Sequence, residues 1–348
     1  MMALFIPLAI LLSASLIALS SISAHLAALQ LVWMVVGLGL VAIFFMFDWK
    51  VILNYRWMIG GLYVIASAML VTTYFISPIV RNVRSWIIVG PFTFQPVELA
   101  KVALILAYAS YFSRRHLGVA RWKHIATSFF IFLVPAVLTA LQPDLGSALV
   151  LFGIWFGFLV LSGLPPRRFF AALGVFMVVG VFMWLFVLKD YQRARVEAVL
   201  YPSHNDLGVS YSAAQSKIAI GSSGFWGKGY GQGSEVQLGF LTEPASDFVF
   251  AAFVEEWGVF GAMVVIGAFL LLLFQILRIG SKKSKNFEKF ICLGTATVLG
   301  IQFLLNVGSE LGLTPVIGVT FPFVSYGGSS LFACFLLIAI VNAIARER

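Results

Sequence analysis

Long apolar runs separated by short polar loops dominate this sequence. The runs are about 18 to 25 residues long, the length that an α-helix needs to cross the hydrocarbon core of a bilayer. A transmembrane β-barrel would instead show short segments of alternating polarity. The pattern therefore predicts an all-α polytopic membrane protein with about ten transmembrane helices. These are expected over residues 3–22, 29–47, 57–76, 95–112, 125–141, 145–161, 169–188, 248–277, 290–307 and 331–344.

Two segments depart from this pattern of spans and loops. Residues 189–246 are polar and are expected to form one large loop outside the membrane. Residues 311–330 are apolar but contain Pro315, Pro322 and several glycines. Non-helical backbone is tolerated at membrane depth only where it is buried in protein or lines a wet cavity. We therefore expect a re-entrant segment there, within a single integral membrane domain that covers residues 1–348.

Composition supports the membrane class and excludes several others. The chain is 61% hydrophobic and 11% charged, whereas roughly a quarter of residues are charged in soluble domains. The net charge of +9 does not indicate a nucleic-acid partner, because the cations fall in short loops between the spans. The four histidines are scattered, and both cysteines lie inside apolar runs. Neither a His-built metal site nor a redox pair is expected.

The placement of the cations predicts how the chain is oriented. Most Lys and Arg residues of the short loops fall on one side of the predicted spans, and only Arg81 and Arg84 fall on the other. The positive-inside rule therefore places both termini in the cytoplasm and residues 189–246 outside. Most Asp and Glu residues gather in the outward loops or at the outer ends of the spans. Because acids contribute little to orientation, we interpret this asymmetry as a sign of chemistry at the outer face.

Asp247 stands where the large polar loop meets the eighth span. One interpretation is an N-cap, because Asp accepts hydrogen bonds from the free N–H groups at a helix start. The other is a general base. Glu243, Glu255 and Glu256 lie nearby in the sequence, and several carboxylates around one helix start favour a raised pKa for at least one of them. The sequence slightly favours the general base.

Two other sites carry charged residues near the membrane. Glu98 and Lys101 are three residues apart and share one face of the fourth span. They form either a structural ion pair or a contact with substrate, and both interpretations stay open. Asp144 follows Pro143 in a tight turn, so capping of the sixth span is favoured there, which is compatible with a place at a cavity wall.

A glycine-rich run covers residues 220–233. It does not match a phosphate-binding loop, because Gly227-Lys228 is followed by Gly229 and not by Ser or Thr. The glycines suit either a compact loop or a close approach of the backbone to a ligand. Arg193, Arg195, Lys217 and Lys228 are outward cations that could meet a pyrophosphate, and attraction to lipid head groups is the alternative.

Several short motifs, in order along the chain, resemble those of the SEDS family (shape, elongation, division, sporulation). They occupy residues 95–101, 142–147, 191–193, 215–221, 238–243, 247–248 and 322–330, and they read QPVELAK, QPDLGS, YQR, QSKIAIG, LGFLTE, DF and PFVSYGGSS. Residues 191–193 and 312–318 are more similar to the elongation members of the family than to the division members. The resemblance covers nearly the whole chain.

The resemblance implies a peptidoglycan glycosyltransferase of cell elongation in the bacterial cytoplasmic membrane. Such an enzyme polymerises lipid II, whose sugars are carried on undecaprenyl pyrophosphate, into glycan strands. By this resemblance Asp247 is the essential acid, and Glu98, Lys101 and Asp144 line the central cavity. The implied partners are lipid II, membrane lipid and a class B penicillin-binding protein that supplies the transpeptidase.

The remaining candidates concern the rest of the substrate site and the other possible classes of function. Arg193, Lys217 and Glu243 are further candidates for substrate binding. The pyrophosphate could be met by Arg193, Lys217 or Lys101, or by a divalent cation such as Mg²⁺ or Mn²⁺ held by carboxylates. Two alternatives to an enzyme stay open at this point: a lipid II flippase, and a non-catalytic scaffold for a penicillin-binding protein.

Overall fold

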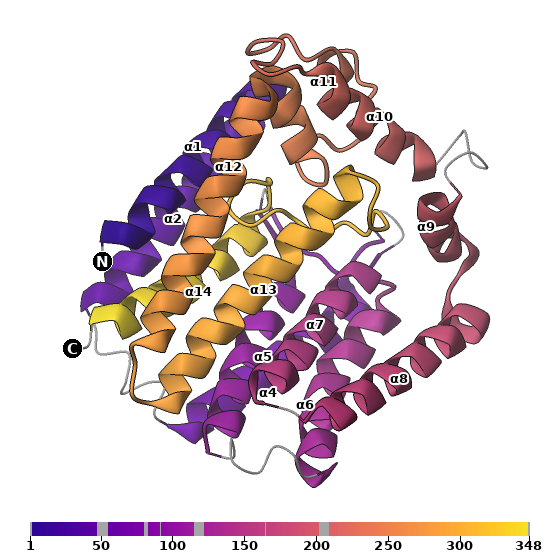
Figure 1. The fold of residues 1–348 in the computed structure, drawn as a ribbon. Coiled ribbons are helices and arrows are strands. Elements are labelled where there is room, and N and C mark those ends of the chain that lie inside the picture. The colour runs from indigo at the N-terminus through magenta and orange to yellow at the C-terminus, as the bar shows by residue number, and fades with distance from the viewer. Residues whose placement is uncertain are drawn as a thin grey trace.

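The protein, described here from a computed structural model, is built almost entirely from helices (Figure 1). The structure describes residues 2–46, 55–79, 83–90, 92–114, 122–163, 165–201 and 209–346. Within these residues the elements are α1 (Met2–Ile22), α2 (Ala24–Met46), α4 (Arg56–Ile76), β1 (Ile87–Val89), β2 (Phe92–Phe94), α5 (Pro96–Ser113), α6 (Trp122–Leu141), α7 (Leu145–Leu161), α8 (Pro166–Phe182), the π-helical turn η1 (Met183–Val187), α9 (Asp190–Leu200), α10 (Val209–Ser222), α11 (Ser234–Gln237), α12 (Val249–Ser281), α13 (Asn286–Glu310) and α14 (Gly328–Arg346). The prediction of an all-α polytopic fold is confirmed.

Each predicted span corresponds to a helix: α1, α2, α4, α5, α6, α7, α8, α12, α13 and α14. Within the described residues, 7 helices are long and apolar enough to cross a membrane. The predicted bounds differ most at the seventh span. It was expected as one helix over residues 169–188, but the α-helix ends at Phe182 and the chain continues as η1. π-helical structure is rare and occurs mostly as single turns of this kind, so a sequence pattern of ordinary helical period does not predict it.

The predicted large loop, residues 189–246, contains the helices α9, α10 and α11, which its polar composition did not indicate. Figure 1 shows α10 and α11 at one end of the bundle, with both chain termini toward the other end. Residues 311–327 all lie within the described part of the chain and contain no helix. Their prediction as a re-entrant segment stays a prediction, but their irregular backbone fits it.

Helices α5, α13 and α14 form the centre of the bundle. In the most apolar 18-residue stretch of each helix, 83% is buried in α14 and 61% in α13, against 22% in α2 and in α4. The outer helices turn apolar side chains outward, for example Val35, Val64 and Phe130. A helix that is apolar on its exposed face belongs in contact with lipid. Glycines let the central helices approach closely, as where Gly157 of α7 faces Thr297 of α13.

Candidate active site

Asp247 lies directly before α12 and is half buried. The N-cap of α12 is Phe248, so the aspartate stands one position outside the helix. The interpretation of Asp247 as the N-cap is therefore wrong. The N–H groups at this helix start are met instead by Glu310, the last residue of α13, whose carboxylate accepts a hydrogen bond from the backbone N–H of Ala251.

Backbone contacts hold Asp247 on two sides. The N–H groups of Asp247 and Phe248 both donate to the carbonyl of Glu243, at 3.2 and 3.3 Å. Glu243 has φ 52°, in the left-handed region, which makes a tight turn before the helix. On the other side, Nδ2 of buried Asn306 donates to the carbonyl of Asp247 at 3.0 Å and to that of Val319 at 3.0 Å. Asn306 thus joins the acid to residues 311–327.

Residues 311–327, called the 311–327 loop below, cover the acid. A Cβ atom added to Gly318 would lie 3.7 Å from Oδ2 of Asp247, so the carboxylate faces this glycine. The Ser325 hydroxyl donates to the Ser246 carbonyl at 2.6 Å, and the Tyr326 N–H donates to the Ala245 carbonyl at 2.8 Å. The loop therefore packs along the residues that lead into Asp247.

The same loop also contacts Lys217 and the start of α7. A Cβ atom on Gly312 would lie 3.1 Å from Nζ of Lys217, and one on Gly146 would lie 2.3 Å from the carbonyl oxygen of Ile317. Lys217 is exposed on α10. The 311–327 loop thus brings one predicted cation and the helix that begins after Asp144 to the side of the bundle where Asp247 lies.

Asp144 is the N-cap of α7. Its carboxylate accepts hydrogen bonds from the N–H of Ser147 at 3.0 Å and from its hydroxyl at 2.8 Å. Nε2 of Gln95 donates to it at 3.0 Å, and the hydroxyl of Ser85 donates at 3.4 Å. The capping interpretation is confirmed, and these contacts also join the starts of α5 and α7.

Glu98 and Lys101 form an ion pair of 2.8 Å near the start of α5, and both side chains are buried. The interpretation as a structural ion pair is confirmed. The pair lies against α14, close enough to Cys334 for an electrostatic interaction with the thiol. An ion pair inside a span faces the interior of the bundle because charge is costly in contact with lipid. Contact with substrate stays a prediction.

Arg193 lies on α9, and its guanidinium donates to the carbonyl of Leu185 in η1 at 3.2 Å. Figure 1 shows α9 at the edge of the molecule, apart from α12 and α13. The structure therefore does not bring Arg193 to Asp247. Among the described residues, no group of three His, Cys, Asp or Glu side chains is arranged to hold a metal ion.

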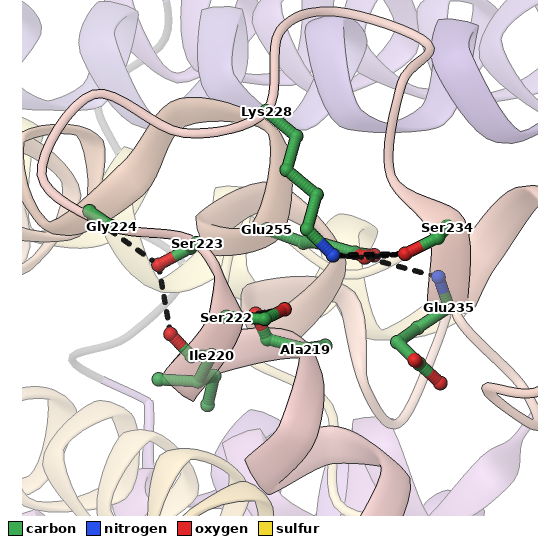
Figure 2. A network of polar contacts seen from close by, with 9 residues as sticks. All are labelled: Ala219, Ile220, Ser222, Ser223, Gly224, Lys228, Ser234, Glu235 and Glu255. Carbon is green, nitrogen blue, oxygen red and sulfur yellow. Dashed lines mark hydrogen bonds and ion pairs between the residues drawn. The ribbon is translucent and has the colours of Figure 1, made fainter.

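Glu255 and Glu256 do not gather at the start of α12 as the sequence suggested. They lie at the end of its first part, just before a break at Gly258, where φ is 68°. Figure 2 shows Oε1 of Glu255 as the acceptor for Nζ of Lys228 at 2.7 Å and for the backbone N–H of Glu235 at 3.0 Å. The hydroxyl of Ser234 also donates to Glu255, at 3.2 Å.

The glycine-rich loop, residues 223–233, is compact because it wraps around this break in α12. A Cβ atom on Gly227 would lie 2.1 Å from the carbonyl oxygen of Glu256, so only glycine fits there. The N–H of Gly231 donates to Glu256 at 3.1 Å, and the hydroxyl of Ser21, near the end of α1, donates to the same oxygen. Of the two interpretations of the glycines, the compact loop is the one that the contacts support.

Two residues of this region, Asn306 and Glu310, are not among those that the sequence pattern predicts for the site. Asn306 and Glu310 both lie near the end of the ninth predicted span, in a stretch that reads NVGSE. A polar residue inside or at the end of an apolar span is a signal for a buried role. That signal was present, but the sequence alone does not show that α13 ends beside the start of α12.

Comparisons with known proteins agree with this architecture. The family described as "Cell cycle protein", which comprises FtsW, RodA and SpoVE, matches residues 1–348. The peptidoglycan glycosyltransferase MrdB of Escherichia coli K12 is 35% identical over 287 residues, which are 82% of this chain and 77% of MrdB. A probable peptidoglycan glycosyltransferase FtsW of Tolumonas auensis is 38% identical over 299 residues, 83% of this chain and 76% of that protein.

Solved structures show the same fold. A chain from a study of how a peptidoglycan synthase complex coordinates polymerization and crosslinking superimposes with a TM-score of 0.87 at 29% identity, covering 99% of this chain and 97% of that one. The rod shape determining protein RodA of Thermus thermophilus superimposes with a TM-score of 0.73 at 27% identity, covering 99% and 96%. With the family match over the whole length, this chain belongs to the FtsW, RodA and SpoVE family, the SEDS family that its motifs resemble.

Proposed function

We propose that this protein is a peptidoglycan glycosyltransferase that polymerises lipid II at the outer face of the bacterial cytoplasmic membrane during cell elongation. Its relatives include the glycosyltransferase MrdB and probable glycosyltransferases named FtsW. The observation that carries the proposal is the place of Asp247: half buried, one residue outside α12, and facing Gly318 of the 311–327 loop.

Asp247 is proposed as the general base. Its carboxylate takes the proton from the C4 hydroxyl of the acceptor sugar while that oxygen attacks the anomeric carbon of the donor. The bond from the anomeric carbon to the lipid pyrophosphate breaks in the same step, and the pyrophosphate leaves with the electron pair. An α-linked donor gives a β-linked product, so the reaction inverts in one displacement without a covalent enzyme intermediate.

We propose that Lys217 is the cation that stabilises the negative charge on the leaving pyrophosphate. It is exposed, and its ammonium lies beside Gly312 in the same loop whose Gly318 faces Asp247. The other predicted cations are engaged elsewhere: Lys101 pairs with Glu98, and Arg193 contacts η1. Cations at the site of developing negative charge are a large source of transition-state stabilisation. Glu98, Lys101, Asp144 and Glu243 would then shape the cavity and not carry the reaction.

The setting of the enzyme follows from the charge pattern and the relatives. The positive-inside rule supports termini in the cytoplasm, and Figure 1 shows them toward the end of the bundle away from α10 and α11. One structural relative comes from a complex that joins polymerization to crosslinking. We propose a class B penicillin-binding protein as the crosslinking partner of this chain.

Polymerisation of lipid II by the purified protein in liposomes tests the function. We expect glycan strands from the wild type and a loss of about 10²–10⁴-fold in rate from Asp247→Asn, because general-base help is worth that much. Glu288→Gln is the matched control: Glu288 is a buried acid in the first turn of a helix, α13, at the other end of that helix from Glu310. Equal rates from Asp247→Asn and the wild type would remove Asp247 as the base.

A further inference from the structure

The backbone N–H groups in the first turn of α12 receive no hydrogen bond acceptor from the side chain of the N-cap residue. Four backbone N–H groups at a helix start lack partners inside the helix, and Ser, Thr, Asp or Asn at the N-cap usually accepts from one of them. Here the N-cap is Phe248, whose ring offers no such acceptor. Phe248, Val249 and Phe250 are all buried, so water does not reach this turn freely. An unmet N–H group in such surroundings is costly.

Glu310 supplies this acceptor from another helix. Its carboxylate accepts from the N–H of Ala251, the third residue of α12, and also interacts with the N–H of Phe250. Glu310 is 0% exposed. The hydroxyl of Ser216 on α10 donates to its carbonyl at 2.9 Å. The residue is therefore fixed between α10, α12 and its own helix α13.

The second carboxylate oxygen of Glu310, Oε1, is buried and has no hydrogen-bond partner among the residues that the structure describes. A side chain held for ordinary packing would not place an oxygen there, because a buried polar atom without a partner lowers stability. The cost indicates that the contacts of the first oxygen matter at this position. Glu310 also lies close enough to Asp247 for the two carboxylates to interact electrostatically.

We propose that Glu310 is a positioning residue for the catalytic acid: it caps α12 in place of Asp247 and so keeps the Asp247 carboxylate directed at Gly318. This inference rests on the proposed function of Asp247. An aspartate one residue before an uncapped helix start is within reach of the free N–H groups and would be drawn to them. With Glu310 in place, its carboxylate already accepts hydrogen bonds from these N–H groups. The Asp247 carboxylate therefore stays directed at Gly318.

Two kinds of substitution separate capping from charge. Glu310→Met keeps the length of the side chain and removes the oxygen acceptor, so Asp247 becomes the nearest acceptor for the first turn. We expect kcat for lipid II polymerisation to fall about tenfold or more, with KM changed less than about threefold, because the surface that binds substrate is intact. Glu310→Gln keeps an amide oxygen that accepts the same N–H bonds, and we expect it to restore most of kcat.

Hydrogen exchange of the amides of residues 249–252 tests the capping directly and does not depend on activity. Exchange should be faster in Glu310→Met than in the wild type, since the cap is lost. It should be faster still in the double variant Glu310→Met, Asp247→Ala, because the aspartate that takes over the cap is then missing. Asp247→Ala alone should leave exchange in this turn unchanged.

The experiment compares the wild type, Glu310→Met, Glu310→Gln, Asp247→Ala and the control Gln302→Ala, all purified in detergent and checked by thermal unfolding. Gln302 is a buried polar residue two turns earlier on the same helix. Glu310→Ala serves as a second deletion in case methionine disturbs the packing. The proposal is overturned if both deletions keep the wild-type kcat, if Glu310→Gln is as slow as Glu310→Met, or if the double variant exchanges no faster than Glu310→Met. A fully active Asp247→Ala would refute the proposed base, while the exchange data would still decide the capping.

Discussion

Replacing Lys228 with methionine should release the glycine-rich loop from α12. Nζ of Lys228 lies 2.7 Å from Oε1 of Glu255, whose side chain is fully buried. The backbone of the loop is bound to the same stretch: the N–H of Lys228 donates to the Glu255 carbonyl at 2.9 Å, and that of Gly229 donates to the Glu256 carbonyl at 3.0 Å. The variant keeps the aliphatic part of the side chain and removes the ammonium, which pairs with Glu255 and also donates to the hydroxyl of Ser234 at 2.9 Å.

The free energy that the substitution costs depends on Glu255, whose buried carboxylate is left without its partner. Removing one member of a buried ion pair costs about 3–5 kcal/mol, because the other charge stays buried without its partner. Lys228 is 26% exposed, so solvent weakens the pair, and we take about 2–3 kcal/mol for opening of the loop. That energy corresponds to about a 30- to 150-fold larger opening constant. Adding Glu255→Gln to Lys228→Met removes the unpaired charge and should return about half of the loss.

Hydrogen exchange of the glycine-rich loop measures this opening, with the amides of Lys228 and Gly229 as the probes. Lys285→Met is the matched control, because Lys285 is 63% exposed and lies 3.9 Å from Glu288. A surface pair of that kind contributes at most about 1 kcal/mol, so the control should leave the loop amides unchanged. Exchange in Lys228→Met within about threefold of the wild type, or a double variant that opens more than the single, would refute the reasoning.

Two further predictions concern the same end of the bundle. Gly258→Ala should lower the melting temperature by several degrees in a thermal unfolding assay. A Cβ atom there would lie 2.3 Å from both the nitrogen of Gly227 and the carbonyl oxygen of Phe225, and φ is 68°. The control Gly267→Ala should leave the melting temperature unchanged, because a Cβ atom at Gly267 meets nothing within 4 Å. Asn306→Ala should reduce kcat for polymerisation about tenfold, because the donor to the carbonyls of Asp247 and Val319 is lost. Asn306→Asp keeps an acceptor oxygen but also lacks this donor, so it should be equally slow. A rate like that of the wild type would show that these two hydrogen bonds do not position Asp247.

The membrane fold was largely predictable because bilayer length leaves few choices. Each apolar run of sufficient length became a helix, and residues 311–327, where Pro and Gly interrupt the pattern, did not. The large polar loop was less predictable. Its helices α9 and α10 carry little apolar periodicity, and the interaction that fixes the glycine-rich loop comes from Glu255, far along the chain from Lys228. Such contacts depend on tertiary structure, which local sequence does not encode.

The residues of the candidate site were also predictable only where their partners lie close to them in the sequence. Asp144 was predictable as a cap because the cap and its helix are adjacent in sequence, and Glu98 was predictable as a pair with Lys101 because both lie on one helix face. Glu255 lies two turns from Asp247, as its place in the sequence implies, but it pairs with Lys228 and does not join Asp247 in one cluster of carboxylates. Glu310 was missed because its partner, Ala251, belongs to another helix.

The carboxylates at this end of the bundle therefore have separate tasks, and their burial tells them apart. Glu255 and Glu310 are 0% exposed and are held by donors from the glycine-rich loop and from the start of α12. A fully buried carboxylate cannot reach the hydroxyl of a lipid-linked sugar, whereas a general base must come within about 3 Å of the proton that it accepts. Asp247 is half buried and faces a residue without a side chain. Of these three carboxylates, Asp247 is therefore the one whose exposure fits the proposed general base, while Glu255 and Glu310 hold the surrounding structure together.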